Sequence, residues 1–300
     1  MKNLRHNIQI LAMLVLMIGL QSCSDDLHDV GDVQVCFTAT LPAAAYARSF
    51  GKAEQVNTLV VGIFKKEKAD VHTNNGGNWN YREIDRKSFP INGTSVDAQL
   101  ELAQNQTYSF VFWAYDKNQD IYNIGDLTAI TMEMAKDDNG KPLPVTFGQV
   151  ESSDAFFAIQ EDISVTGNCS YPVELERPLA QINVGTTGTP IHAAFKAKSV
   201  PDTFYPFTYT VSGTAEYTWD FSETTTEIFT VEDQQYNYLT MVYVFAPAAA
   251  TNVVAELTMT DGDKSKTVEF PEVAIGANQR TNIAGNFTVT EEEIFNISIT

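Results

Sequence analysis

Apolar and polar side chains alternate with a period of two in several short stretches of this chain, and this pattern limits the fold more than any other feature. From residue 33 to residue 41 every second side chain is apolar, and residues 295–299 alternate in the same way near the other end. Residues 253–259 also alternate, apart from Val254. Because successive side chains of a strand point to opposite faces of a sheet, each stretch predicts a half-buried β-strand.

Other segments extend this prediction to the whole chain. Residues 58–64 and 108–115 are apolar on both faces, which is typical of central strands. Further short apolar segments are separated by turns rich in Gly, Pro and Asn. Short strands at this spacing indicate β-sandwiches, so we predict an all-β protein.

Residues 126–135 allow two interpretations. Asp126 could cap a helix whose apolar face would include Ile130 and Met134. Ile130, Met132 and Met134 also alternate as the residues of a strand do. Both interpretations remain open at the level of sequence.

The length of 300 residues suits a leader followed by two domains of ordinary size. A boundary near residues 175–178 is indicated by Pro172 and Pro178, which flank a short charged segment. We therefore predict two tandem Greek-key β-sandwich domains of transthyretin-like type. The predicted divisions are a signal peptide at 1–22, a lipidated tether at 23–32, and the two domains at 33–176 and 177–300.

The N-terminus has the pattern of an export signal. Lys2 and Arg5 precede an apolar stretch at residues 10–20 that is too short to cross a bilayer. Cys23 follows Leu-Gln-Ser, an order that resembles a bacterial lipobox, in which the Cys thiol is acylated and becomes the first residue. We expect a surface-exposed outer-membrane lipoprotein, anchored by acyl chains such as palmitate on Cys23.

Charge and cysteine content limit partners and cross-links. The net charge of −19 should repel phosphate backbones, so we expect no nucleic-acid partner. With Cys23 committed to lipid, Cys36 and Cys169 remain, and an oxidising compartment would allow them to pair. Nothing in the sequence shows that they lie close together, so a disulfide and two separate thiols both stay open.

Few residues are suited to catalysis or metal binding. Beyond the leader and tether the histidines are His72 and His192, and neither lies near a nucleophile motif. No Cys/His cluster has ligand spacing, and the turns at 137–140 and 261–263 lack the bidentate Glu of a calcium loop. We expect no enzyme, metal or cofactor, although the 38 acidic residues leave open a glycosidase-like carboxylate pair.

Two tryptophans could form a binding surface. Trp79 lies in a segment rich in Asn and Gly, and Trp219 precedes Asp220. Exposed indole rings at these positions could stack on sugars, which makes both residues candidate glycan contacts. The alternative is that they help to close the edges of the sandwiches.

Five segments share their order with a known family. They are residues 108–115, 154–158, 175–184, 238–247 and 278–283. Together with the lipobox, this order resembles the fimbrillins, the lipoprotein pilins of Bacteroidia, and their relatives. Each motif is loose, so the order is the specific part. Leu-x-Arg-x-x-Ala commonly opens the second domain of such proteins, and Leu175, Arg177 and Ala180 match it here.

The resemblance implies a mechanism of assembly. Fimbrillin precursors reach the outer membrane as lipoproteins, and an arginine-specific or trypsin-like protease cuts the loop after the first strand. The strand is freed, and a strand of another subunit fills the apolar groove by β-strand addition. In this sequence the predicted removable strand contains Val33, Val35 and Phe37. The predicted cleavage site is the bond between Arg48 and Ser49. The predicted donor strand contains Phe295, Ile297 and Ile299.

We therefore predict a cell-surface structural or adhesion subunit of a fimbrium. It would assemble with itself or with related subunits by protease-triggered strand exchange, and a host or microbial surface ligand is a further candidate partner. The alternative is a glycan-binding lipoprotein that stays anchored at Cys23 and does not polymerise. A hydrolase is a third and weaker alternative.

Overall fold

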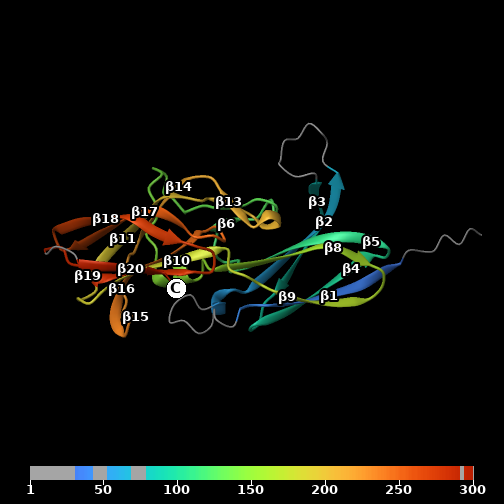
Figure 1. The fold of residues 1–300 in the computed structure, drawn as a ribbon, viewed down its shortest axis with the longest axis horizontal. Coiled ribbons are helices and arrows are strands. Elements are labelled where there is room, and N and C mark those ends of the chain that lie inside the picture. The colour runs from blue at the N-terminus through green and yellow to red at the C-terminus, as the bar shows by residue number, and fades with distance from the viewer. Residues whose placement is uncertain (1–30, 43–52, 69–78, 291–293, 300) are drawn as a thin grey trace, which may run out of the picture.

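The computed structural model describes residues 31–42, 53–68, 79–290 and 294–299, and nearly all of its regular structure is β-strand (Figure 1). The short helical elements in these ranges are the α-helix α2 (Phe147–Glu151) and the 3-10 helices η2 (Ala53–Gln55) and η3 (Pro206–Thr208). No helix in the described ranges is long and apolar enough to cross a membrane. The predicted all-β class is confirmed.

The first sandwich consists of two sheets from the first part of the chain. The smaller sheet has the order β4-β1-β9, formed by β4 (Ser95–Ala103), β1 (Asp32–Thr40) and β9 (Cys169–Glu174). The larger sheet has the order β3-β2-β5-β8, formed by β3 (Trp79–Pro90), β2 (Thr58–Lys68), β5 (Gln106–Tyr115) and β8 (Ala155–Val165). The apolar faces of the two sheets enclose one core, which includes Phe37, Phe110 and Phe112.

The second sandwich is larger. One sheet has the order β15-β16-β10-β19-β20, formed by β15 (Ile228–Val231), β16 (Gln234–Phe245), β10 (Leu179–Thr186), β19 (Arg280–Asn286) and β20 (Ile294–Ile299). The other has the order β14-β11-β17-β18, formed by β14 (Ala215–Asp220), β11 (His192–Val200), β17 (Thr251–Asp261) and β18 (Lys264–Ile275). The alternating residues 253–259 lie within β17, as the pattern predicts.

A small fifth sheet joins the two halves of the chain. Its order is β13-β12-β7-β6, formed by β13 (Thr210–Ser212), β12 (Thr203–Tyr205), β7 (Ile130–Met132) and β6 (Tyr122–Asn123). The predicted division at residue 176 lies between β9 and β10, yet β6 and β7 precede it and β12 and β13 follow it. The rings of Trp113, Phe204 and Phe245 pack in the larger core, with centroids of Phe204 and Phe245 5.8 Å apart. Packing, not only the chain, therefore connects the sandwiches.

The helix interpretation of residues 126–135 is wrong, and the strand interpretation is correct. Ile130 and Met132 point into the core from β7, which pairs with β6 and β12. Asp126 does stabilise a local turn, because its Oδ1 accepts a hydrogen bond from the backbone N–H of Thr128 at 2.8 Å. Burial of the period-two apolar face therefore outweighs the capping signal.

Candidate functional site

β1 is the central strand of its sheet. It is antiparallel to β4 along its whole length and parallel to β9 from Val35 to Thr40. Both backbone edges of β1 are therefore hydrogen-bonded. The predicted removable residues Val33, Val35 and Phe37 all lie on this strand, so its withdrawal would leave a gap one strand wide between β4 and β9.

The inward face of β1 fills the first core. Val35, Phe37 and Ala39 are buried, and Val33 is partly buried against the same core. The Phe37 ring lies 4.6 Å from the ring of Phe110 and 5.6 Å from that of Tyr171, measured between centroids. Burying a phenylalanine contributes about 1.5–3 kcal/mol, so an empty β1 position would expose a substantial apolar groove.

The chain on both sides of β1 is tied to the sandwich. The backbone N–H of Gln34 donates to Asn168 Oδ1 at 2.9 Å, near the start of the strand. At the other end the backbone N–H of Leu175 donates to the carbonyl of Thr40 at 2.9 Å. Beyond β1, the predicted cleavage residues Arg48 and Ser49 lie outside the described residues, as does Cys23 in the segment before it.

The two remaining cysteines do not form a disulfide. Cys169 lies opposite Val35 in the parallel ladder and packs with the first core, whereas Cys36 occupies the alternate position of β1. Their side chains therefore point to opposite faces of the sheet, and both thiols are free. A bridge would require the register between β1 and β9 to change.

β20, which contains the predicted donor residues, lies at a sheet edge. It pairs with β19 alone among the described strands. Phe295 packs against Phe270 and Phe287, with ring centroids 5.1 and 5.8 Å away. Ile297 and Ile299, on the same face of the strand, remain 36 % and 41 % exposed. An edge strand with exposed apolar side chains is suited to pairing with another chain.

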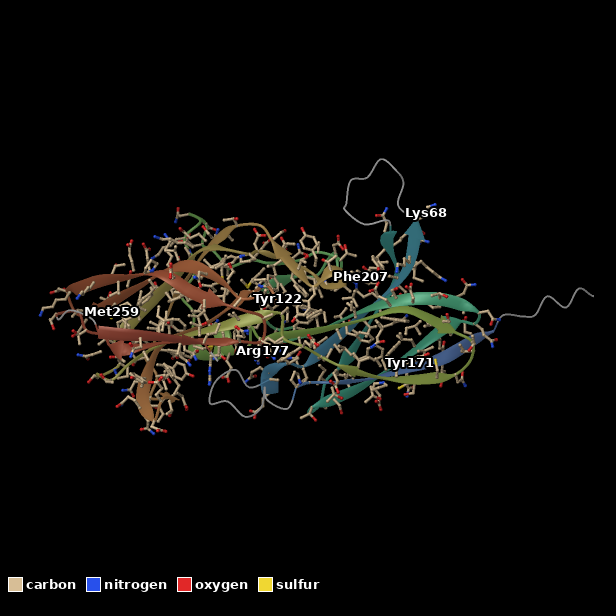
Figure 2. All side chains as sticks on the ribbon, in the orientation of Figure 1. Lys68, Tyr122, Tyr171, Arg177, Phe207 and Met259 are labelled. Atoms are coloured by element: carbon tan, nitrogen blue, oxygen red, sulfur yellow. The ribbon has the colours of Figure 1, made fainter. Side chains whose placement is uncertain are left out.

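A buried ion pair lies where the chain passes from β9 to β10. Arg177 and Asp154 are each about 1 % exposed, and the guanidinium donates two hydrogen bonds to the carboxylate, at 2.7 and 2.5 Å. Burial alone would lower the pKa of Arg177, but the charge of Asp154, the hydrogen bonding to its carboxylate and the nearby Tyr243 and Tyr122 together outweigh it, and the pKa is raised. Figure 2 shows Arg177 between Tyr171 of the first sandwich and Met259 of the second.

Sequence reasoning had not assigned this pair a role. The sequence marks Arg177 only as part of the boundary motif, and Asp154 only as part of a strand-like segment. The two residues are separated by 23 positions, and β8 and β9 lie between them, so no local spacing brings them together. The sole signal was an arginine between Glu176 and Pro178 in an otherwise strand-rich region.

The two candidate glycan tryptophans differ. Trp79 is the first residue of β3, where its backbone pairs with that of Lys68. Trp219 lies on β14 and is only 1 % exposed, because Phe195 and Tyr217 pack against it with centroids 6.4 and 5.9 Å away. The prediction of an exposed, stacking Trp219 is therefore wrong, although one edge of its ring reaches a pocket.

Metal-binding geometry is not found in the part of the chain that the structure describes. No group of three or more His, Cys, Asp or Glu side chains there could hold a metal ion. His192 starts β11 and is exposed, while His72 lies outside the described residues. The residues that the structure does bring together are those of β1 with its two neighbours.

Several solved structures resemble this chain. A candidate adhesin from Bacteroides thetaiotaomicron VPI-5482 matches over 91 % of this chain and 97 % of its own, with 13 % identity and a TM-score of 0.52. The fimbrial anchor protein Mfa2 of Porphyromonas gingivalis matches over 89 % of this chain and 97 % of its own, with 11 % identity and a TM-score of 0.48. The C-terminally truncated tip fimbrial protein Mfa3 of the same species matches over 89 % and 99 %, with 12 % identity and a TM-score of 0.45.

The likeness to the candidate adhesin shows a shared fold. No curated protein matches the sequence. Residues 27–300 match the model of a family described as a family of unknown function, DUF6562. Since this match extends over nearly the entire chain, the protein belongs to the DUF6562 family.

Proposed function

We propose that this protein is a cell-surface structural or adhesive subunit that assembles by strand exchange. Cleavage between Arg48 and Ser49 releases β1, and β20 of another copy or of a related subunit takes its position. The role is structural and not catalytic. The observation that carries the proposal is the position of β1 between β4 and β9, where one N-terminal strand completes the first sandwich.

Loss of β1 makes the binding of a replacement strand strongly favourable. It leaves backbone N–H and C=O groups unpaired along β4 and β9, and it exposes the apolar surface around Phe110, Phe112 and Tyr171. An incoming strand with alternating apolar residues restores the ladder hydrogen bonds and the core contacts together. A polar or irregular segment would restore neither in full.

β20 has the properties of such a strand. Phe295, Ile297 and Ile299 repeat at the same two-residue spacing as the buried residues of β1. Leaving its own sheet breaks one ladder, because among the described strands β20 pairs only with β19. Moving two half-exposed isoleucines into a buried groove adds apolar burial at about 25 cal/mol per Å².

The same cleavage would free the subunit from the membrane. Cys23 precedes β1 in the chain, so acyl chains on its thiol would leave with the released strand. We propose that Cys23 anchors the uncleaved precursor in the outer membrane and that assembly begins once the anchor is removed.

An arginine-specific protease tests the proposed cleavage site selectively, because the described arginines are protected from cleavage. Arg82 and Arg86 lie within the paired strand β3, Arg280 starts β19, and Arg177 is buried. Proteases cut exposed, unpaired segments in preference to strands held in a sheet. Cleavage of the folded protein should therefore be confined to Arg48.

The test starts from the chain beginning at Ser24, digested with an arginine-specific protease and followed by intact mass and gel filtration. We expect one cut after Arg48, loss of residues 24–48, and a series of oligomers. Arg48→Gln should stay intact and monomeric. A chain ending at residue 293 should be cut but remain unable to form oligomers. Oligomers that form equally well without cleavage or without β20 would contradict the proposal.

A further inference from the structure

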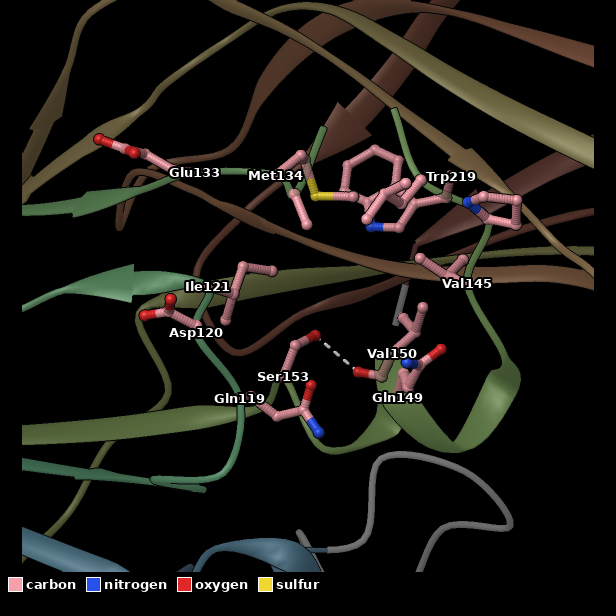
Figure 3. Close-up of a pocket in the computed structure, with 13 residues that line it drawn as sticks. Gln119, Asp120, Ile121, Glu133, Met134, Val145, Gln149, Val150, Ser153 and Trp219 are labelled. Atoms are coloured by element: carbon pink, nitrogen blue, oxygen red, sulfur yellow. Dashed lines mark hydrogen bonds between the residues drawn. The ribbon is translucent and has the colours of Figure 1, made fainter. Parts of the chain in front are cut away.

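A pocket with a volume of about 180 Å³ lies beside β14 (Figure 3). Its walls come from residues 119–121, 133–135 and 143–153, which fold over Trp219. None of the residues that line it belongs to β1 or β20. Any ligand of this pocket would therefore bind independently of strand exchange.

The walls of the pocket are fixed by hydrogen bonds between these segments. The backbone N–H of Glu133 donates to the carbonyl of Ile121 at 2.8 Å, which holds the first two segments together. The backbone N–H of Val145 donates to the carbonyl of Asp220 at 2.8 Å, which ties the third segment to β14. A pocket held in this way is already formed before a ligand arrives, so binding requires little ordering.

The lining combines apolar walls with neutral polar groups. Ile121, Met134, Val145 and Val150 supply apolar surface, as Figure 3 shows. Ser153 contributes a hydroxyl that donates to the carbonyl of Val150 at 2.6 Å and can still accept a hydrogen bond. Gln119 and Gln149 add amide groups to the lining.

Trp219 supplies a donor that the protein does not use. Its indole nitrogen lies on the pocket side of the ring (Figure 3), and no residue in the described ranges accepts a hydrogen bond from it. The residue is otherwise buried, and an indole N–H in such surroundings usually has a partner. A ligand with an acceptor oxygen would satisfy it.

The charge at the rim limits the ligand class. Asp120 and Glu133 are exposed carboxylates at the pocket, and among the residues that the structure describes no Lys, Arg or His belongs to the lining. An anionic ligand such as a phosphate or an acidic sugar would meet repulsion with no compensating cation. The pocket therefore suits a neutral ligand.

We infer that this pocket binds one neutral pyranose ring of a glycan. An apolar cavity of about 150 Å³ can hold benzene, so the volume here fits one six-membered ring. The C–H faces of a pyranose match the apolar walls, and its hydroxyl oxygens match the indole N–H, the serine and the two amides. A plain hydrocarbon would fill the space but leave the Trp219 donor unpaired.

The test uses the chain beginning at Ser24 and the methyl glycosides of glucose, galactose, mannose and N-acetylglucosamine, one at a time. Saturation-transfer NMR and calorimetry report binding, and tryptophan fluorescence reports contact with an indole. We expect at least one glycoside to bind with a dissociation constant of about 1 mM, which is typical of a single small ring. Glucuronate should bind at least about tenfold more weakly, because of the two carboxylates.

Two substitutions locate the site. Trp219→Phe keeps a ring but removes the N–H, and should weaken binding about fivefold, the loss of one hydrogen bond. Val145→Phe fills the pocket and should abolish binding. Val254→Phe is the matched control, since Val254 is exposed on β17 away from the pocket, and it should bind as the unmodified chain does. Near-ultraviolet circular dichroism checks that each variant is folded.

Three results would overturn the inference. The first is that no glycoside binds to the folded chain. The second is that toluene binds in the pocket while the glycosides do not, which would make it a plain apolar cavity. The third is that a glycoside binds equally well to Trp219→Phe and Val145→Phe, which would place the sugar elsewhere on the surface.

Discussion

The first and last strands of the described chain, β1 and β20, share a sequence pattern but differ in their positions in the fold. β1 is held on both edges, and its inward side chains are buried. β20 is held on one edge, and of its alternating residues Phe295, Ile297 and Ile299 the two isoleucines remain at least 36 % exposed. Alternation therefore predicts a strand, but the position in the sheet decides whether that strand is locked in place or available to another chain.

Deleting β1 or β20 should give the largest difference in stability between the two strands. A chain that begins after residue 41 should lose the cooperative unfolding of the first sandwich, because its core would be open along one side. A chain that ends at residue 293 should unfold as the unmodified chain does, with a small decrease in melting temperature. Differential scanning calorimetry of the two truncated chains measures this. Equal losses of stability in the two truncated chains would contradict the difference that we infer between β1 and β20.

Single substitutions should reproduce the contrast on a smaller scale. Phe37→Ala should lower the free energy of unfolding by about 3–5 kcal/mol, since it leaves a cavity beside Phe110 and Tyr171. Ile297→Ala should lower it by less than about 1 kcal/mol, because that side chain is already partly in water. Urea denaturation of both variants gives the values, and similar losses would remove the basis of the comparison.

Substitutions in the buried ion pair test whether the two sandwiches unfold together. Asp154→Asn should destabilise the protein by about 3 kcal/mol, because it leaves the Arg177 charge buried without its counter-charge. The double variant Asp154→Leu with Arg177→Met should recover most of this loss. If Asp154→Asn unfolds the first sandwich alone, in two separate calorimetric transitions, the pair does not couple the two halves.

A smaller effect is expected at alkaline pH. Burial and a hydrogen bond to the Glu161 carboxylate raise the pKa of Tyr81 from 10.0 to about 12. The unfolded chain therefore loses the tyrosine proton first, so the stabilisation is complete below pH 10 and is lost as the pH rises toward 12. The ring stacks on Phe207 with centroids 3.6 Å apart, so this contact joins the first sandwich to η3 beside the small sheet.

Melting temperatures measured between pH 9 and pH 11.5 test the contribution of Tyr81. The unmodified chain should show a steeper decline than Tyr81→Phe, which keeps the ring and lacks the proton. Parallel curves for the two proteins would show that Tyr81 does not carry this dependence.

The sequence predicts the positions of the strands better than it predicts which strands pair with each other. The alternation at residues 33–41, 253–259 and 295–299 placed three strands correctly, because burial on one face leaves a local pattern. The sequence does not predict β9, because Pro172 interrupts its short alternating segment. Yet β9 lies beside β1, more than 120 residues away in the chain, and this pairing creates the candidate site.

The pocket shows the same limit of local patterns. Its walls come from two loop segments, a segment that contains α2, and one strand, and no spacing in the sequence predicts that they meet. The sequence did single out Trp219, but as an exposed ring, because a tryptophan beside an aspartate does not reveal which way the strand turns it. Only the pairing of β14 with β11 places that ring in the core.

The central claim is that β20 of one copy replaces β1 of another, and hydrogen exchange followed by mass spectrometry tests it most directly. The amides of β4 and β9 that face β1 should be protected in the intact chain, exchange rapidly in the cleaved chain ending at residue 293, and regain protection in cleaved chains that retain β20. Protection that is lost after cleavage and does not return when β20 is present, even in oligomers, would contradict the account.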